Sequence, residues 1–200
     1  MVMNTSNLAS KLPAVASTQM LNVVTKYKIT NPLRLAHFMA QISHESGNFK
    51  FVKENLNYSK ESLLKVFGKY FNAQNVDAYA RNPEKIGSRV YASRMGNGNE
   101  ASKEGYVFCG RGYLQVTGKE NYRAFSQFIG EDCVANPELI ATKYPMDSAI
   151  WFFDKNKLWD ICDKGGTTEV VTLITKRVNG GTNGLDDRLS KFNMFNVLLA

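Results

Sequence analysis

The sequence predicts a mainly α-helical fold with one small β element. Apolar residues recur at helical spacing through most of the 200-residue chain, and capping residues or glycines bound several of these stretches. Two short apolar runs, on either side of Gly110-Arg111-Gly112, are the candidate strands. A chain of this length can form one domain with a real core, in one lobe or two. We therefore expect residues 1–200 to form a single domain, with residues 60–105 as a candidate smaller lobe.

The best-defined helix is predicted between Asn31 and Glu45. Asn31 can cap its first amides, and Pro32 suits the first helical position. Gly47 can adopt the left-handed conformation that ends many helices, so Glu45 falls in the last turn. The apolar face of this helix, read at helical spacing, consists of Leu35, Phe38, Met39 and Ile42.

Further helices follow from the same kind of pattern. The aromatic run at residues 151–153 could stack on sugars, but aromatic residues at helical spacing more simply form core. The C-terminal stretch could act on membranes, and packing of its apolar face on the core is again the simpler interpretation. In chain order, the predicted helical stretches are residues 5–29 (one helix or two), 59–71, 83–94, 122–129, 147–156, 167–177 and 189–200.

The candidate strands are residues 106–108 and 113–116. In an extended segment, alternate side chains point to the same side, so Gln115 and Thr117 would share one face. The glycines between the strands allow a tight turn and close approach of another backbone. Taken by itself, this pattern predicts a hairpin that exposes Arg111 to solvent.

Composition and charge exclude several classes of protein. Hydrophobic residues make up 44% and charged residues 22%, which is ordinary for a globular protein, and no apolar run reaches the ~20 residues of a membrane-spanning helix. The first residues lack the charged start and apolar stretch of a signal peptide. The net charge of +7 favours an anionic partner. Nucleic acid is not favoured, because the basic residues are spread along the chain without a known binding motif.

The cysteines and histidines form no recognisable metal or disulfide pattern. Cys109, Cys133 and Cys162 are odd in number and lack CxxC spacing, which predicts reduced thiols. Cys109 would need a base to act as a nucleophile, and the chain has two histidines, His37 and His44. Both are interpreted as satisfied or solvated side chains, because HESGN is not the zinc motif HExxH.

Two glutamates stand out as a candidate pair of catalytic carboxylates. Glu45 lies at the negative end of its helix beside apolar residues, and both surroundings favour the protonated form that a general acid needs. Glu54 follows nine residues later, after a break at Gly47 that lets the chain return. Inverting glycoside hydrolysis uses two carboxylates roughly 6.5–9.5 Å apart. Either residue taken alone would be interpreted as a solvated surface charge.

The ordered set of motifs resembles the glycoside hydrolase family 19 domain, and its phage endolysin branch more than the plant chitinases. The matching segments are AQISHESGNF, ENLNYS, YASRMGNGNEAS, GRGYLQVTGKENY and VNGG, which run in order through most of the chain. The resemblance implies a lysozyme-like helical domain with a small β-hairpin. The short interval between Glu45 and Glu54 is similar to the endolysins, whereas plant chitinases have a longer insertion and disulfides that this chain lacks.

The resemblance also implies a role for individual residues. Glu45 is the general acid, Glu54 the general base, and the hydroxyl of Thr117 helps to place the attacking water. No metal or organic cofactor is implied. Without the resemblance, Arg188 would be interpreted as part of a surface ion pair. The substrate-binding residues implied are Tyr58, Arg111, Gln115, Asn121, Tyr122, Asn179 and Arg188.

The function implied is that of an endolysin, which hydrolyses β-1,4 bonds of bacterial peptidoglycan and lyses the host cell. Anionic cell-wall polymer is also the partner that suits the positive charge, and we expect a monomer without stable membrane insertion. The expected location is the host cytoplasm, followed by action on the wall after release through the inner membrane. The alternatives are a chitinase, a lytic transglycosylase that needs a single acid, and a wall-binding protein without catalytic activity.

Overall fold

The computed structural model describes residues 3–200, which divide into two compact units. Unit 1 is built from Met1–Val52 and Pro145–Ala200, and unit 2 is the intervening segment Lys53–Tyr144. The chain therefore leaves unit 1 after residue 52, completes unit 2 and returns. The smaller lobe expected at residues 60–105 lies inside unit 2.

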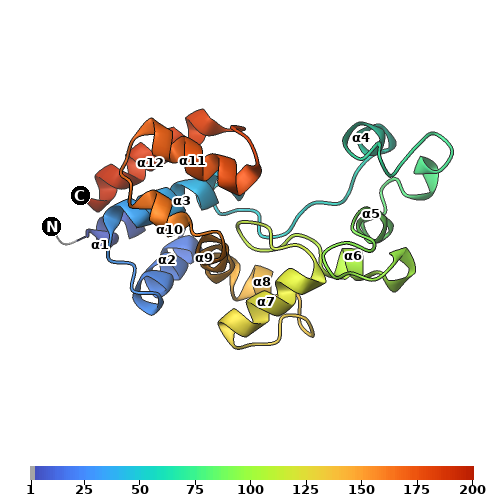
Figure 1. Ribbon diagram of the computed structural model, residues 1–200, viewed down its shortest axis with the longest axis horizontal. Helices are drawn as coiled ribbons and strands as arrows, with labels where there is room; N and C mark the ends of the chain where they lie inside the picture. The colour runs from blue at the N-terminus through green and yellow to red at the C-terminus, as the bar shows by residue number, and fades with distance from the viewer. Residues whose placement is uncertain (1–2) are drawn as a thin grey trace. The chain divides into compact units, whose positions relative to one another are not determined.

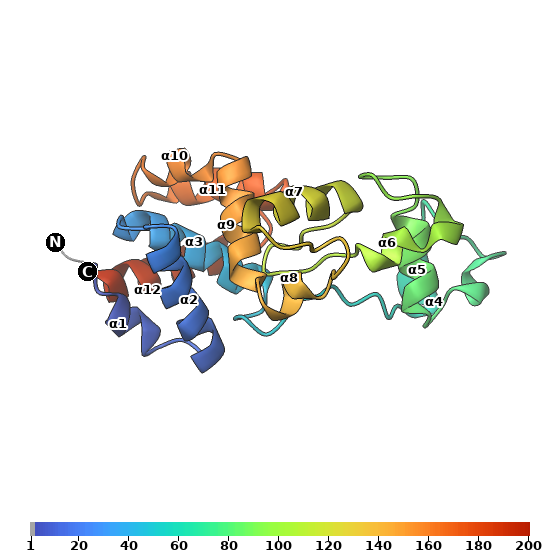
Figure 2. The same cartoon turned by 90° about the horizontal axis from the view of Figure 1, so that it is seen from below.

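In the described part of unit 1 the regular secondary structure consists of helices joined by turns and loops. Helix α12 lies along α3 (Figures 1 and 2). Asn31 caps α3 by accepting a hydrogen bond from the amide of Leu33 at 2.9 Å, and Pro32 occupies the first turn, as predicted. The buried ring of Phe192 on α12 stacks on His37 of α3 with centroids 4.1 Å apart. The helices of unit 1 are α1 (Thr5–Ala9), α2 (Ala14–Lys26), α3 (Pro32–Glu45), α9 (Pro145–Lys155), α10 (Leu158–Cys162), α11 (Thr168–Asn179) and α12 (Leu185–Leu199).

Unit 2 consists of short helices around its own apolar cluster, whose members include Leu56, Ile86 and Cys109. Helix α5 packs against α6 (Figures 1 and 2), and a Cβ atom added at Gly105 would clash with the carbonyl of Gly87. Glycine at residue 105 therefore permits this close packing. The elements are α4 (Lys60–Val66), the 3₁₀ helix η1 (Val76–Ala78), α5 (Pro83–Val90), the 3₁₀ helix η2 (Glu100–Ser102), α6 (Glu104–Val107), α7 (Lys119–Ile129) and α8 (Leu139–Thr142).

The mainly α prediction is confirmed, but the two predicted strands are wrong. Residues 106 and 107 belong to α6, and residues 112–115 form a turn. The β element reduces to two isolated antiparallel bridges, one between Lys53 and Arg111 and one in which Arg111 and Val116 exchange backbone hydrogen bonds of 3.1 and 2.7 Å. Tyr, Val and Phe favour strands, but β preference depends strongly on context, and here packing of α6 on α5 decides the conformation.

The aromatic run is core, as expected, with Trp151 and Phe153 both buried. The C-terminal stretch is helical and buries Phe192, Phe195 and Leu199 in unit 1. Over residues 3–200, no helix combines the length and apolar character required to cross a membrane.

Candidate active site

Glu45 is the last residue of α3, in unit 1. Ser46 caps the helix end, and Gly47 follows with φ of +57°, the left-handed conformation that the sequence predicted. The side chain of Glu45 is 27% exposed. The carboxylate is therefore held at a fixed helix end but remains open to a ligand on one side.

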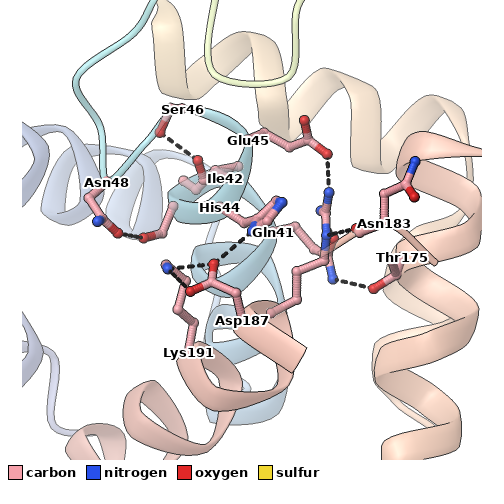
Figure 3. A network of polar contacts seen from close by, with 12 residues as sticks. Gln41, Ile42, His44, Glu45, Ser46, Asn48, Thr175, Asn183, Asp187 and Lys191 are labelled. Carbon is pink, nitrogen blue, oxygen red and sulfur yellow. Dashed lines mark hydrogen bonds and ion pairs between the residues drawn. The ribbon is translucent and has the colours of Figure 1, made fainter. Parts of the chain in front are cut away.

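Arg188 of α12 forms an ion pair with Glu45 that joins residues 143 positions apart. Its Nη2 donates to Oε1 of Glu45, and its Nη1 donates to Oε1 of Gln41 at 2.5 Å. Gln41, one turn before Glu45 on α3, in turn donates through Nε2 to Oγ1 of Thr175 on α11 at 3.3 Å. Figure 3 shows Gln41, Glu45 and Thr175 converging from two helices. Three helices of unit 1 thus fix one oxygen of the carboxylate.

A second polar link joins α3 and α12 beside the first (Figure 3). Nδ1 of His44 lies 2.6 Å from Oδ2 of Asp187, which also accepts from Nζ of Lys191 at 2.6 Å. His44 and Asp187 each immediately precede a member of the Arg188–Glu45 pair in sequence. A Cβ atom at Gly184 would clash with the His44 ring, so the turn before α12 packs directly on α3.

Glu54 lies in unit 2 and both of its carboxylate oxygens accept hydrogen bonds. The amide of Gly110 donates to Oε1 at 2.8 Å, and the hydroxyl of Tyr91 donates to Oε2 at 2.8 Å. The backbone amide of Glu54 also donates to the carbonyl of Gly110, at 2.9 Å. Burial, followed by the negative charge of Glu54, raises the pKa of Tyr91 far above its ordinary value. The phenol therefore remains a donor.

Gln115 and Thr117 lie beside Gly110, next to the Glu54 carboxylate. Gln115 has φ of +53°, which is strained for a residue with a side chain, and its Nε2 donates to the carbonyl of Gly112 at 3.0 Å. Its Oε1 is buried and has no hydrogen-bond partner. Oγ1 of Thr117 donates to the carbonyl of Gln115 at 3.0 Å, and a Cβ atom at Gly110 would lie 3.3 Å from that hydroxyl. The same Cβ atom would clash with Oε1 of Gln115, so glycine at 110 leaves room for the end of that side chain.

Comparison with known proteins identifies the family. Residues 14–171 match the family 19 glycoside hydrolase model described as chitinase class I. A Haemophilus influenzae protein described as a glycosyl hydrolase family 19 domain-containing protein is 38% identical over 177 residues, covering 87% of this chain and 84% of the relative. The chain belongs to glycoside hydrolase family 19. It is therefore a glycosidase that acts on a glycan.

Solved structures of family 19 chitinases share the fold of this hydrolase. A bacterial family 19 chitinase aligns with a TM-score of 0.57 at 19% identity, covering 92% of this chain and 84% of that one. The class IV chitinase of Zea mays aligns with a TM-score of 0.52 at 18% identity, covering 90% of this chain and 77% of that one. The lysozyme-like helical fold implied by the sequence motifs is confirmed.

The hydrolase buries Arg111 and Tyr122, two of the predicted substrate contacts, and direct contact with a sugar stays a prediction for both. Arg111 is 3% exposed and Tyr122 is fully buried, with Nη1 of the arginine 2.7 Å from the tyrosine hydroxyl. Nη2 of Arg111 also donates to Oε1 of Glu138 at 2.6 Å, and this hydrogen bond lowers the pKa of Glu138 to about 2. Tyr122 donates to the carbonyl of Cys109 at 2.6 Å. Both side chains support the loop that carries Gly110.

Arg188 is also buried, at 1% exposure, so the alternative of a surface ion pair is wrong, and direct substrate contact stays a prediction. Its guanidinium donates to the side chains of Glu45 and Gln41 on α3. Asn179 ends α11, and its Nδ2 donates to the carbonyl of Asn183 at 2.9 Å, the same oxygen that accepts from Nε of Arg188 at 3.3 Å. Asn179 thereby connects to the Arg188 network through one shared carbonyl.

The remaining predicted residues lie in unit 2 and stay predictions as sugar contacts. Tyr58 is half-buried, and its pKa is raised by burial and then by the charge of Glu54. Asn121 is half-buried at the start of α7 and donates through Nδ2 to the carbonyl of Thr117 at 2.8 Å. Unit 2 therefore gathers Glu54, Gln115 and Thr117, and unit 1 carries Glu45.

Tyr91 is the functional neighbour that sequence reasoning missed. It opens the segment YASRMGNGNEAS, which carried part of the family resemblance, so the signal was present without a role attached to it. Gln41, which lies in the matching segment AQISHESGNF, was not assigned to the site either. Both side chains act through hydrogen bonds to partners that sequence spacing does not predict.

The three cysteines and His37 are buried inside their units. The three cysteines are free and buried, and burial raises the pKa of the Cys109 thiol, which disfavours a nucleophilic thiolate. His37 is buried, with Nε2 2.9 Å from the carbonyl of Gly165. Within residues 3–200, no three His, Cys, Asp or Glu side chains are grouped so that they could hold a metal ion.

Proposed function

We propose that this family 19 hydrolase cleaves β-1,4 glycosidic bonds of bacterial peptidoglycan with inversion, as a phage-type endolysin that lyses its host. Family membership supports glycoside hydrolysis. The net charge of +7 supports an anionic polymer as the partner. In this proposal the enzyme acts as a monomer on the wall, after its release from the cytoplasm of the host.

The single observation that carries the mechanism is the contrast between the two carboxylates. One oxygen of Glu45 is bound by Arg188, whereas both oxygens of Glu54 accept from neutral donors. Oε2 of Glu45 is left free of these contacts and can hold a proton toward the leaving oxygen. The carboxylate that remains after proton transfer is stabilised by the guanidinium.

Glu54 acts as the general base in this mechanism. A carboxylate oxygen has two acceptor sites, so each oxygen of Glu54 keeps one after its hydrogen bond. Glu54 takes a proton from water, the water oxygen attacks the anomeric carbon, and the glycosidic carbon–oxygen bond breaks as Glu45 protonates the leaving oxygen. Thr117 and Gln115, beside Gly110, are proposed to hold the water and the sugar.

Chitin is the second candidate substrate, and a specific observation favours it. The family model is described as chitinase class I, and a tomato relative named acidic 27 kDa endochitinase is 45% identical over 56 residues, which is 27% of this chain. Chitin presents the same linkage on an uncharged polymer. The charge of this chain favours peptidoglycan over it.

The test is a digestion of purified peptidoglycan and of colloidal chitin in parallel. Mass spectrometry of the fragments identifies the bond that is cut, and proton NMR in the first minutes identifies the anomer released. The proposal expects faster release from peptidoglycan and an initial α-anomer. Release from chitin alone would assign the enzyme as a chitinase. An initial β-anomer or an anhydro sugar would overturn the inverting mechanism.

A further inference from the structure

The hydroxyl of Tyr91 is one of the two donors that hold the Glu54 carboxylate. It lies 2.8 Å from Oε2, while the amide of Gly110 lies 2.8 Å from Oε1. The Gly110 amide belongs to a backbone segment, so a side-chain change leaves it in place. Tyr91 is therefore the donor that can be removed without altering the loop at Gly110.

The position of Tyr91 is itself fixed from two sides. Its backbone amide donates to the carbonyl of Gly87 at 3.1 Å at the end of α5, and its carbonyl accepts from Nδ2 of Asn97 at 2.9 Å. Asn97 is 7% exposed, and its Oδ1 accepts from the amide of Lys119, the first residue of α7, at 2.9 Å. The segment YASRMGNGNEAS therefore ties the tyrosine to both α5 and α7.

We propose that Tyr91 is a positioning residue whose hydroxyl holds the Glu54 carboxylate in one orientation for proton transfer from water. The inference rests on the proposed function of Glu54 as the base. A hydrogen bond from a neutral donor stabilises the ionised form of a carboxylate over its protonated form. The second acceptor site on Oε2 stays available, so the same contact orients the group without blocking it.

A purely structural role for Tyr91 would leave the pH–rate profile unmoved. Loss of a hydrogen bond to the ionised form of the base should move the acidic limb of this profile upward. Loss of one such hydrogen bond corresponds to a shift of roughly one pH unit. Substrate binding should change little, because Tyr91 acts through Glu54 in this proposal.

The experiment compares Tyr91→Phe with the wild type on purified peptidoglycan between pH 3 and 9. The matched control is Tyr79→Phe, because Tyr79 also lies in unit 2 and donates to a carboxylate, that of Glu100, at 2.6 Å. The expected result is an acidic limb of kcat displaced upward by about one pH unit in Tyr91→Phe alone, with KM within twofold of the wild type. Circular dichroism and thermal unfolding establish that both variants fold.

A wild-type profile in a folded Tyr91→Phe enzyme would overturn the inference. Should this variant not fold, fluorinated tyrosine at residue 91 keeps the shape and makes the hydroxyl a stronger donor, so the limb should move downward, and an unmoved limb overturns the inference equally. Glu54→Gln separates the two proposals. If it stays fully active, the assignment of Glu54 as the base fails; if it is inactive while Tyr91→Phe behaves as wild type, the role of Tyr91 alone fails.

Discussion

Glu45 in unit 1 and Glu54 in unit 2 are the same functional group held in different ways. Glu45 contacts a cation, Arg188, that is itself buried and bound to Gln41. Glu54 contacts only neutral donors, a phenol and a backbone amide. The first arrangement places a cation at one carboxylate oxygen and leaves the other oxygen open, whereas the second holds both oxygens with donors that carry no charge. Two glutamates nine residues apart can thus take different chemical roles.

The two carboxylates also differ in how far along the sequence their hydrogen-bond partners lie. The partner of Glu45 comes from a helix 143 residues away, so unit 1 must be complete before the ion pair exists. The donors to Glu54 come from the end of α5 and from the loop after α6 inside unit 2, at separations of 37 and 56 residues. A change in either unit should therefore disturb one carboxylate without removing the contacts of the other.

The largest expected effect comes from removing each carboxylate in turn. Glu45→Gln and Glu54→Gln should each lower turnover by about 10²–10⁴-fold, because each removes one acid–base step. Azide should partly restore Glu54→Gln, since this anion attacks without a base. A nitrophenyl leaving group should partly restore Glu45→Gln, since such a group needs little protonation. Mass spectrometry of the glycosyl azide measures the first rescue, and chromophore release measures the second.

The controls for these variants are exposed glutamates of the same units, Glu169→Gln in unit 1 and Glu61→Gln in unit 2, which should keep wild-type turnover. Rescue of both active-site variants by the same additive would break the comparison, because the two carboxylates would then share one role.

The next effect concerns stability and distinguishes a buried ion pair from an exposed one. Arg188→Met should lower the free energy of unfolding by about 3 kcal/mol, because Glu45 and Gln41 lose a buried partner. Arg34→Met is the control in the same unit. Its ion pair with Asp163 is exposed on both sides, at 38% and 39%, and should contribute at most ~1 kcal/mol. Urea unfolding followed by circular dichroism compares them, and equal losses would contradict a special role for Arg188.

A smaller effect concerns how the stability of unit 1 depends on pH. Burial lowers the pKa of His37 below its ordinary 6.5, so the unfolded chain binds this proton more readily than the folded one. The contribution of neutral His37 to the free energy of unfolding is therefore fully present above pH 6.5. It is lost as the pH falls through the pKa that His37 has in the folded protein. His37→Phe should flatten the decline of the thermal midpoint between pH 7.5 and 5.5. An unchanged slope in this variant would assign the decline to other groups.

The smallest effect belongs to unit 2 and lies at lower pH. The pKa of Glu138 is lowered from 4.5 to about 2 by its hydrogen bond with Arg111. Its contribution is present above pH 4.5 and is lost as the pH falls toward 2. Since the side chain is 59% exposed, solvent screening limits this contribution to about 1 kcal/mol. Glu138→Gln should weaken the protein at pH 6 and not at pH 2, and an equal loss at both values would exclude the ion pair as its cause.

Local signals in the sequence were sufficient for the helix that carries Glu45. Asn31, Pro32 and Gly47 act within one turn of the helix ends, and the structure uses each of them as predicted. Residues 106–108 were assigned wrongly because their conformation depends on packing of Gly105 against Gly87, which a three-residue pattern does not encode.

The partners of the candidate site were harder to predict than its position. Burial of Arg111, Tyr122 and Arg188 depends on contacts made across each unit, and side chains that occur in a family motif can support a site without touching its ligand. Tyr91 was missed because nothing in its own spacing links it to Glu54, which lies 37 residues earlier.

The insertion of unit 2 between residues 52 and 145 has a consequence for the order in which the protein matures on the ribosome. Synthesis proceeds from the N-terminus, so unit 2 emerges whole and can fold while α3 still lacks α12. Closing unit 1 then requires joining segments separated by the entire inserted unit, which makes this the slow, high-contact-order step. Glu54 can receive both of its donors early, whereas Glu45 meets Arg188 only when residue 188 has been added. A nascent chain can therefore form the contacts of Glu54 long before it can form those of Glu45.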